Sequence, residues 1–479
     1  MVFSSLLFLY LFFPLCLLVY KLAGTLSHKN TVLIIFSLIF YSWAGPKYLI
    51  LLLGMVFINW VAGLLMADGE HHAARRKLGL WVALIGSLGL LVYFKYTSFF
   101  LGSLHDATGF PEIVPNIVLP IGISFYTFQL LSYSIDVYRG DVKAQKSYKI
   151  LLLYASLFHQ CIAGPIVRYQ DVEQQIIGRR VLLRDTAEGI TRFTVGLAKK
   201  TLLANTCASI IVKLMPEGAD IRSLPAVSLW MGMLLFMLQI YLDFSAYSDM
   251  AIGMGKMVGF HYRENFDYPY MSKSVSEFWR RWHISLGSFF RDYVYIPLGG
   301  NRKGSGRTVL NLLIVWGLTG LWHGASWNYV LWGLYFFVFI AMEKLFLRGP
   351  LERAPRILSH LYLLAVVFFG WILFKFENLA DGWLVFKGLF GLNGNGFMSG
   401  EARIVLLNYV FFILLAIVAV TPLCKSIMAR FDRSAENTGG LALVRVNGVV
   451  RIVLPIVLML LSTMALIGNS YNPFLYFQF

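Results

Sequence analysis

Long runs without a charged residue recur along this chain, and they constrain its fold more than any other feature. About 20 consecutive apolar residues cross the hydrocarbon core of a bilayer as a helix. Hydrophobic residues make up 58% of the 479 positions and charged residues only 14%, whereas soluble domains are roughly 25% charged. A soluble fold cannot bury so much apolar surface. The sequence therefore predicts an all-α, polytopic membrane protein.

The expected spans follow from the charge-free runs. These runs are 1–20, 31–46, 48–67, 78–94, 113–135, 150–167, 223–242, 308–342, 357–374, 404–424 and 452–479, with a weaker one near 193–214. The first run lacks a basic segment before it and a clear cleavage site, which predicts a retained helix rather than a signal peptide. We expect about eleven or twelve transmembrane helices, with additional re-entrant or buried helices.

Two of the runs do not fit a simple crossing. Residues 150–167 lie between two basic stretches, which a full crossing would place on opposite faces of the membrane, so we expect a re-entrant or buried segment. The 35 residues of 308–342 would make a helix of about 50 Å, too long for one crossing. We predict a helical hairpin with a short first arm, about 309–321, and His323 at a tip inside the membrane.

The excess of basic residues indicates the orientation of the chain. The net charge is 41 − 25 = +16, and such an excess collects in cytoplasmic loops, so it does not indicate a nucleic-acid partner. Both termini are then expected on the outer side. Four single cysteines have no metal-binding spacing, so we expect no metal site and interpret all four as packing residues. They are Cys16, Cys161, Cys207 and Cys424.

Ionisable residues inside the apolar runs are the candidate site residues, because such groups are expensive in a membrane. His323 is the only histidine centred in a charge-free run. It is either a core histidine bonded to a backbone carbonyl or a general base in a dry cavity. His283 has the same two interpretations, with less support from its position. Asp243 and Asp249 either orient a histidine or pair with arginines for structural reasons.

Residues 261–307 form the most polar stretch, in which basic and aromatic residues alternate. Residues 274–295 have helical spacing. This pattern is typical of an interfacial amphipathic helix that binds lipid phosphates. The alternative is a cytoplasmic mouth that binds a polyanionic donor, with Arg280, Arg281 and Arg291 on its phosphates. The catalytic motifs of common soluble enzymes are absent.

At these residues the chain resembles the membrane-bound O-acyltransferase family. The resemblance is carried by WRRWHISL at 279–286, RDYVYIPLGGNR at 291–302 and LWHGA at 321–325, and further by LPIGISFYTFQ at 119–129, AGPIVRY at 163–169, YLDFSAYSDMAIG at 241–253 and NPFLYFQF at 472–479. It extends over essentially the whole chain. Within the family, the chain looks most like the branch that O-acetylates bacterial exopolysaccharides such as alginate.

The resemblance implies a single acyltransferase domain over 1–479 in the bacterial inner membrane. That domain would comprise N-terminal helices (1–150), a catalytic core (150–400) around a central funnel, and C-terminal helices (401–479). His323 and His283 match the two functional histidines of the family. Acetyl-CoA would be the donor substrate, with no tightly bound cofactor. The partners would be the lipid bilayer and a periplasmic polysaccharide acetyltransferase, whose serine, or the sugar itself, accepts the acetyl group.

Two other functions remain open on the sequence alone. Broken helices with polar groups near the membrane midplane also occur in transporters and flippases for polysaccharide or lipid precursors. The chain has no internal repeat, which makes this alternative weaker. An acyltransferase for long acyl chains is the third possibility, and a wide tunnel would favour it.

Overall fold

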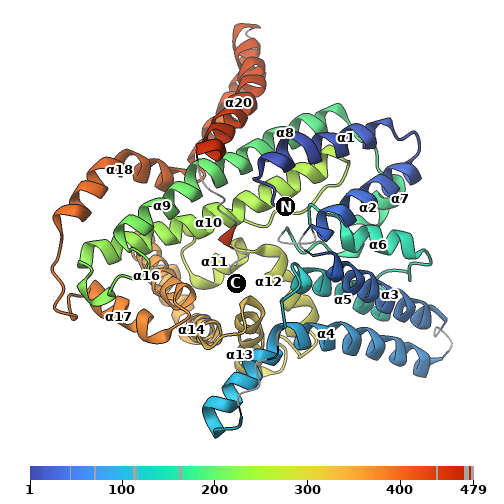
Figure 1. The fold of residues 1–479 in the computed structure, drawn as a ribbon, viewed down its shortest axis with the longest axis horizontal. Helices are drawn as coiled ribbons and strands as arrows, with labels where there is room; N and C mark the ends of the chain where they lie inside the picture. Colours follow the sequence, from blue (N-terminus) through green and yellow to red (C-terminus); the bar gives the residue numbers. More distant parts are fainter. Residues whose placement is uncertain are drawn as a thin grey trace. The chain divides into compact units, whose positions relative to one another are not determined.

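The computed structural model describes residues 1–43, 45–68, 72–111, 115, 117–160, 164–438, 441–468 and 474–475. Within these ranges the regular structure is helical (Figure 1). The residues form two compact units. The first comprises Met1–Phe193, Met250–Glu264 and Ser288–Pro297, and the second comprises Thr194–Asp249, Asn265–Gly287 and Leu298–Phe479. The all-α fold expected from the sequence is confirmed.

The helices up to residue 198 lie wholly or mostly in the first unit. They are η1 (Phe8–Phe12), α1 (Phe13–Leu22), α2 (Leu26–Ser42), α3 (Pro46–Asp68), α4 (Ala73–Thr108), α5 (Ile123–Arg139), α6 (Tyr148–Ser156), α7 (Tyr169–Gly178) and α8 (Leu183–Ala198). Helix α3 packs against α4, and both pack against α5 (Figure 1). Helix α5 ends at Gly140, whose φ of 85° suits a residue without a Cβ.

The remaining helices follow in chain order. They are η3 (Lys199–Ala204), α9 (Asn205–Leu214), η4 (Ile221–Ser223), α10 (Ala226–Met257), η5 (Pro269–Met271), α11 (Val275–Arg281), α12 (Ile284–Phe290), η6 (Arg291–Tyr295), α13 (Gly304–His323), α14 (Trp327–Met342), η7 (Glu343–Leu347), α15 (Arg348–Arg353), α16 (Arg356–Lys375), α17 (Leu379–Leu389), α18 (Gly400–Ala419), α19 (Leu423–Thr438) and α20 (Leu441–Gly468). Helices α8, α10 and α12 contribute residues to both units.

Eight helices of the described chain are long and apolar enough to cross a membrane. They are Pro46–Ala67, Ala73–Thr108, Leu183–Leu214, Ala226–Met257, Trp327–Arg353, Arg356–Lys375, Gly400–Ala419 and Val444–Gly468. Phe8–Leu22 is a shorter apolar helix. Helices α2 and α5 also match predicted spans, but each has only 17 residues. The weak run near 193–214 lies within Leu183–Leu214, which is one of the eight long apolar helices.

The described part of the run 150–167, residues 150–160 and 164–167, is a buried segment, as predicted. Helix α6 has only 9 residues, which is too short to cross a bilayer. The chain after it is irregular, and His159 and Gln160 are fully buried there. The ring of Phe158 packs against those of Phe8 and Phe12 at centroid distances of 6.2 and 5.6 Å. An aromatic core thus anchors this segment to the N-terminal helices.

The predicted hairpin is present, but its first arm is longer than expected. Helix α13 has 20 residues and α14 has 16, so at about 1.5 Å per residue α13 spans about 30 Å. The arms approach closely because Gly320 and Gly333 face each other. A Cβ on Gly333 would lie 2.4 Å from the carbonyl oxygen of Trp316. The charge-free run marked the apolar part of α13 and missed the polar turn at Gly304–Arg307.

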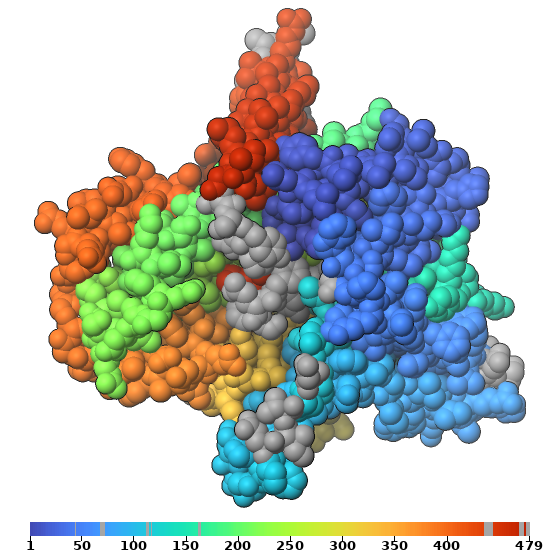
Figure 2. Space-filling model, in the orientation of Figure 1, coloured from blue at the N-terminus to red at the C-terminus, as the bar shows by residue number. Residues whose placement is uncertain are grey.

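The other sequence expectations are met in part. Cys16 and Cys207 are buried and pack as predicted, but Cys424 is exposed, so the packing interpretation is wrong there. Cys161 and the C-terminal residue Phe479 lie outside the described residues. Helix α20, red in Figure 2, exposes apolar side chains along its length, among them Ile452, Ile456, Leu460, Met464 and Ile467. Such a face suits contact with lipid.

Candidate active site

His323 is the last residue of α13 and is 8% exposed. Its ring lies at centroid distances of 4.8 Å from Trp332, 5.5 Å from Phe374 and 5.0 Å from Trp322. The turn after it needs glycine, because a Cβ on Gly324 would lie 2.2 Å from the ring of Tyr329. The hairpin therefore holds one imidazole among aromatic rings, as the sequence placed it, at the end of its first arm.

His283 lies in the turn between α11 and α12, with a φ of 47°. This conformation is uncommon for a residue other than glycine. The single helix predicted over 274–295 is therefore wrong, because the chain turns at Trp282 and His283. The imidazole is 4% exposed. Burial lowers its pKa to about 3, against an opposing hydrogen bond with its own backbone, so the ring is neutral at physiological pH.

The two histidines lie within one aromatic cluster of the second unit. The ring of Trp322 is 5.7 Å from that of His283 and 5.0 Å from that of His323. We call His283, His323, Trp322, Trp332 and Phe374 the histidine site. Imidazole can accept or pass on a proton near neutral pH, and this cluster holds two buried imidazoles side by side with aromatic rings.

The three predicted phosphate-binding arginines differ in their surroundings. Arg280 is exposed and forms no ion pair with any residue that the structure describes. Arg281 pairs with Glu277 at 2.8 Å and with Asp267 at 3.8 Å. Arg291, in the first unit, pairs with Asp292 at 2.7 Å. Of these three arginines, only Arg280 has a guanidinium without a carboxylate partner among the described residues.

Asp243 and Asp249 each pair with a lysine, so the arginine partners expected for a structural role are wrong. The Nζ atom of Lys200 lies 2.7 Å from Asp243, and both side chains are almost fully buried. Lys199 lies 2.6 Å from Asp249. Lys199 and Lys200 belong to the π-helical turn η3, and both aspartates belong to α10. These pairs join the α8–η3 helix to α10.

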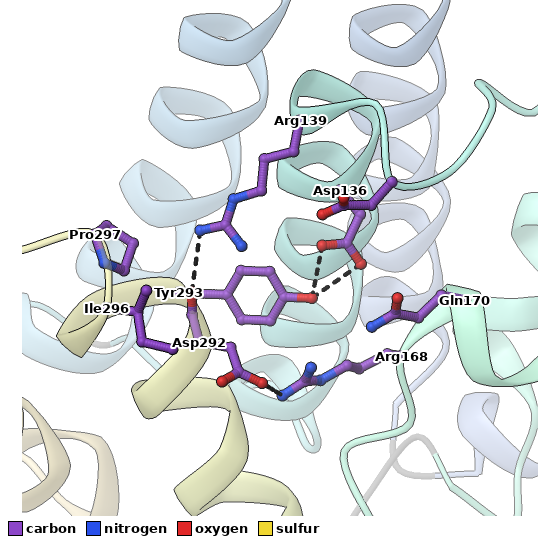
Figure 3. Close-up of a pocket in the computed structure, with 9 residues that line it drawn as sticks. Asp136, Arg139, Arg168, Gln170, Asp292, Tyr293, Ile296 and Pro297 are labelled. Atoms are coloured by element: carbon purple, nitrogen blue, oxygen red, sulfur yellow. Dashed lines mark hydrogen bonds and ion pairs between the residues drawn. The ribbon is translucent and has the colours of Figure 1, made fainter. Parts of the chain in front are cut away.

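A separate group of charged residues, which sequence analysis missed, lines an open pocket of about 530 Å³ in the first unit (Figure 3). We call its main residues, Asp136, Arg139, Arg168, Asp292 and Tyr293, the charged pocket. The hydroxyl of Tyr293 donates to both carboxylate oxygens of Asp136 at 2.8 and 2.9 Å. Arg139 and Arg168 each lie 5.1 Å from the centre of the Tyr293 ring.

The ionic contacts of the charged pocket are internal. Arg168 lies 2.8 Å from a carboxylate oxygen of Asp292, and Arg139 donates to the carbonyl oxygen of Asp292 at 3.0 Å. Burial raises the pKa of Asp136 to about 6, outweighing the hydrogen bond from Tyr293. Burial acts against the ionised form of Asp292 too, but Arg291 and Arg168 outweigh it and lower its pKa. The five residues come from three distant segments, around α5, α7 and η6, so no local pattern in the sequence brings them together.

The donors in the described chain do not form a metal site. Among the residues that the structure describes, no group of three His, Cys, Asp or Glu side chains could hold an ion.

Comparisons with known proteins identify the family of this chain. Residues 5–386 match the family model for the membrane-bound O-acyltransferase family. The "Probable alginate O-acetylase" of Azotobacter vinelandii is 36% identical and covers 100% of both chains. The protein of the same name from Pseudomonas aeruginosa is 41% identical over 81% of this chain and 75% of its own. A peptidoglycan O-acetyltransferase of Helicobacter pylori is 33% identical over 82% of this chain and 80% of its own. This chain, an O-acyltransferase, belongs to the membrane-bound O-acyltransferase family.

Proposed function

We propose that this protein takes acetyl groups from cytoplasmic acetyl-CoA and passes them across the bacterial inner membrane for O-acetylation of an exopolysaccharide. The observation that carries the proposal is the pair of buried imidazoles, His283 and His323, around Trp322. Alginate is the first candidate polymer, because the relatives similar over the full chain are named alginate O-acetylases.

His323 is the general base in this proposal. It removes the proton of an acceptor hydroxyl while the oxygen attacks the thioester carbonyl of acetyl-CoA. The new C–O bond forms, the C–S bond breaks, and the proton passes from the imidazole to the leaving thiolate. A positioned base contributes typically 10²–10⁴-fold to such a step. The aromatic walls exclude water, which would otherwise compete as an acceptor.

His283 and the arginines have supporting roles. His283 either polarises the thioester carbonyl and steadies the developing oxyanion or orients the two substrates. Arg280, which has no carboxylate partner among the described residues, is the arginine most available for a donor phosphate. Arg281 and Arg291 would have to exchange an ion pair for that contact.

Two groups could accept the acetyl group. One is a serine of a periplasmic acetyltransferase subunit, which relays the acetyl group to the polymer, and the other is the sugar hydroxyl itself. Both termini of the chain would lie in the periplasm. The peptidoglycan O-acetyltransferase relative makes peptidoglycan the second candidate polymer.

The experiment compares His323→Ala with His360→Ala in cells and in purified protein. His360 is a matched control, since it lies in the same unit and its imidazole bonds the carbonyl oxygen of Ser272 at 3.0 Å. We expect His323→Ala to lose at least 100-fold in release of CoA from labelled acetyl-CoA at normal protein abundance. Acetate released from alginate and from peptidoglycan identifies the polymer. Wild-type acetylation in the His323→Ala strain would defeat the assignment.

A further inference from the structure

The backbone at His283 is held in place by a residue from another segment, Asn265. The carbonyl oxygen of Asn265 accepts the backbone N–H of Ile284 at 2.9 Å. Its side-chain oxygen, Oδ1, accepts the backbone N–H of Ser285 at 3.1 Å. Asn265 is 3% exposed. It therefore satisfies the first two N–H groups of α12 and fixes the left-handed turn at His283, a conformation that persists only where its surroundings impose it.

The same oxygen of Asn265 determines the direction of a chain of hydrogen bonds. An atom that accepts a backbone N–H must be the amide oxygen, since the amide NH₂ group only donates. The hydroxyl of Ser285 lies 2.8 Å from this Oδ1. Two oxygens need one hydrogen between them, and Oδ1 carries none. The hydroxyl hydrogen of Ser285 therefore points at Asn265.

This direction fixes which nitrogen of His283 carries its proton. The Oγ atom of Ser285 lies 3.5 Å from Nδ1 of His283, at the long end for a hydrogen bond. With its hydrogen committed to Asn265, Oγ turns a lone pair toward the ring. Nδ1 gains a hydrogen bond to this lone pair only if it carries the hydrogen, so the contact favours the Nδ1–H tautomer. A neutral imidazole has one N–H, so Nε2 retains its lone pair.

We propose that Asn265 and Ser285 are positioning residues that hold His283 in the Nδ1–H tautomer, so that Nε2 accepts a hydrogen bond in the acyl transfer. This inference rests on the proposed function and narrows it. In this tautomer His283 cannot donate from Nε2 to the developing oxyanion. Its partner is an O–H or N–H donor, for which the acceptor hydroxyl is the group of matching chemistry. Of the two roles left open for His283, orientation is selected.

The direct test is solid-state NMR of the full-length protein in lipid, labelled with ¹⁵N-histidine. The signals of His283 are those that disappear in His283→Gln. We expect the wild-type ring to show a protonated Nδ1 and an unprotonated Nε2. A protonated Nε2 in the neutral wild-type ring would overturn the proposal, and this measurement does not depend on any variant of the positioning residues folding correctly.

Kinetics of Ser285 variants give the second test. We expect Ser285→Ala to lower kcat by about 10- to 100-fold, by analogy with the loss when the hydrogen-bond partner of a metal-bound histidine is removed, with KM for acetyl-CoA unchanged. Ser285→Thr retains a hydroxyl and should restore kcat to within about threefold of wild type. Ser276→Ala on α11 is the control, since the Ser276 hydroxyl has no hydrogen bond in the described chain. Equal kcat values for Ser285→Ala and Ser276→Ala would overturn the proposal.

The outcomes separate this inference from the proposed function. If His323→Ala and His283→Gln both retain wild-type turnover, the proposed function fails. If both lose turnover while the NMR shows a protonated Nε2, the proposed function stands and the positioning inference alone fails.

Discussion

The histidine site and the charged pocket differ in what surrounds their polar groups. In the charged pocket, the hydroxyl of Tyr293 is bound by Asp136 and the carboxylate of Asp292 by Arg168. At the histidine site, the imidazoles face indole and phenyl rings. Polar groups bound to each other in a pocket hold the structure together, whereas imidazoles lined by aromatic rings are suited to proton transfer in a site that excludes water. The comparison predicts that the pocket supports stability and that the histidine site supports turnover.

The largest expected effect on stability tests the packing of the histidine site. Trp332 is fully buried, and its ring contacts that of His323. Replacing a buried large aromatic residue by alanine typically costs 3–5 kcal/mol, so we expect Trp332→Ala to lower the unfolding free energy by about that amount. Thermal unfolding in detergent measures it. Trp383→Ala is the control, because Trp383 is 56% exposed. Equal losses for the two variants would contradict the assigned packing.

The next prediction separates the two regions by function. Tyr293→Phe removes the hydroxyl that binds Asp136. A hydrogen bond to a charged group contributes about 1.5–3 kcal/mol, so we expect a stability loss of that size with kcat within about twofold of wild type. Tyr138→Phe controls for loss of a hydroxyl, since that of Tyr138 has no hydrogen bond in the described chain. A loss of kcat at unchanged stability would instead place the charged pocket in the reaction.

The third prediction concerns the pH dependence of stability in the charged pocket. The pKa of Asp136 is about 6 in the folded protein against an ordinary 3.8. Between these values the folded state binds more protons than the unfolded state, so stability falls as pH rises from about 4 to about 6. One proton contributes at most about 1.4 kcal/mol per pH unit. Asp136→Asn should flatten this slope in thermal unfolding curves, and the exposed Asp106→Asn should not. If Asp136→Asn leaves the slope unchanged, the pH dependence of stability comes from another group.

The smallest expected effect concerns the donor. An exposed charge contributes little in water, so Arg280→Ala should raise KM for acetyl-CoA only about 1.5- to 5-fold, with kcat unchanged. High salt should abolish the difference, because it screens exposed charges. Arg403→Ala is the matched control, since Arg403 is also exposed. If Arg280→Ala and the wild type have the same KM for acetyl-CoA at low salt, Arg280 has no role in donor binding.

The sequence predicted the long apolar helices and the hairpin, because lipid favours apolar side chains on a crossing helix. Eleven or twelve spans were expected, whereas eight helices of the described chain are long and apolar enough to cross. His323 was found for the same reason, as an ionisable residue within an apolar run. The run reports where the chain is apolar and not where a helix begins, so the first polar turn of α13 was missed.

The turn at His283 could not be predicted, because its cause lies elsewhere in the chain. The helical spacing of aromatic residues continues through 274–295, whereas the break depends on contacts from Asn265. The charged pocket was missed for a related reason. Tyr293 and Asp136 are 157 residues apart, and no local pattern records such a pairing.

The ion pair between Lys200 and Asp243 has a consequence for how the protein enters its membrane. A single lysine or aspartate at the centre of a helix adds about 2.5–3.5 kcal/mol to the free energy of insertion. The helix 183–214 emerges from the ribosome before its partner α10 has been made. We therefore expect helix 183–214 to stay bound to the insertion machinery until Asp243 has been synthesised and can pair with Lys200. Crosslinking of nascent chains truncated before and after residue 243 would reveal such a wait, and release of the shorter chain into lipid would refute it.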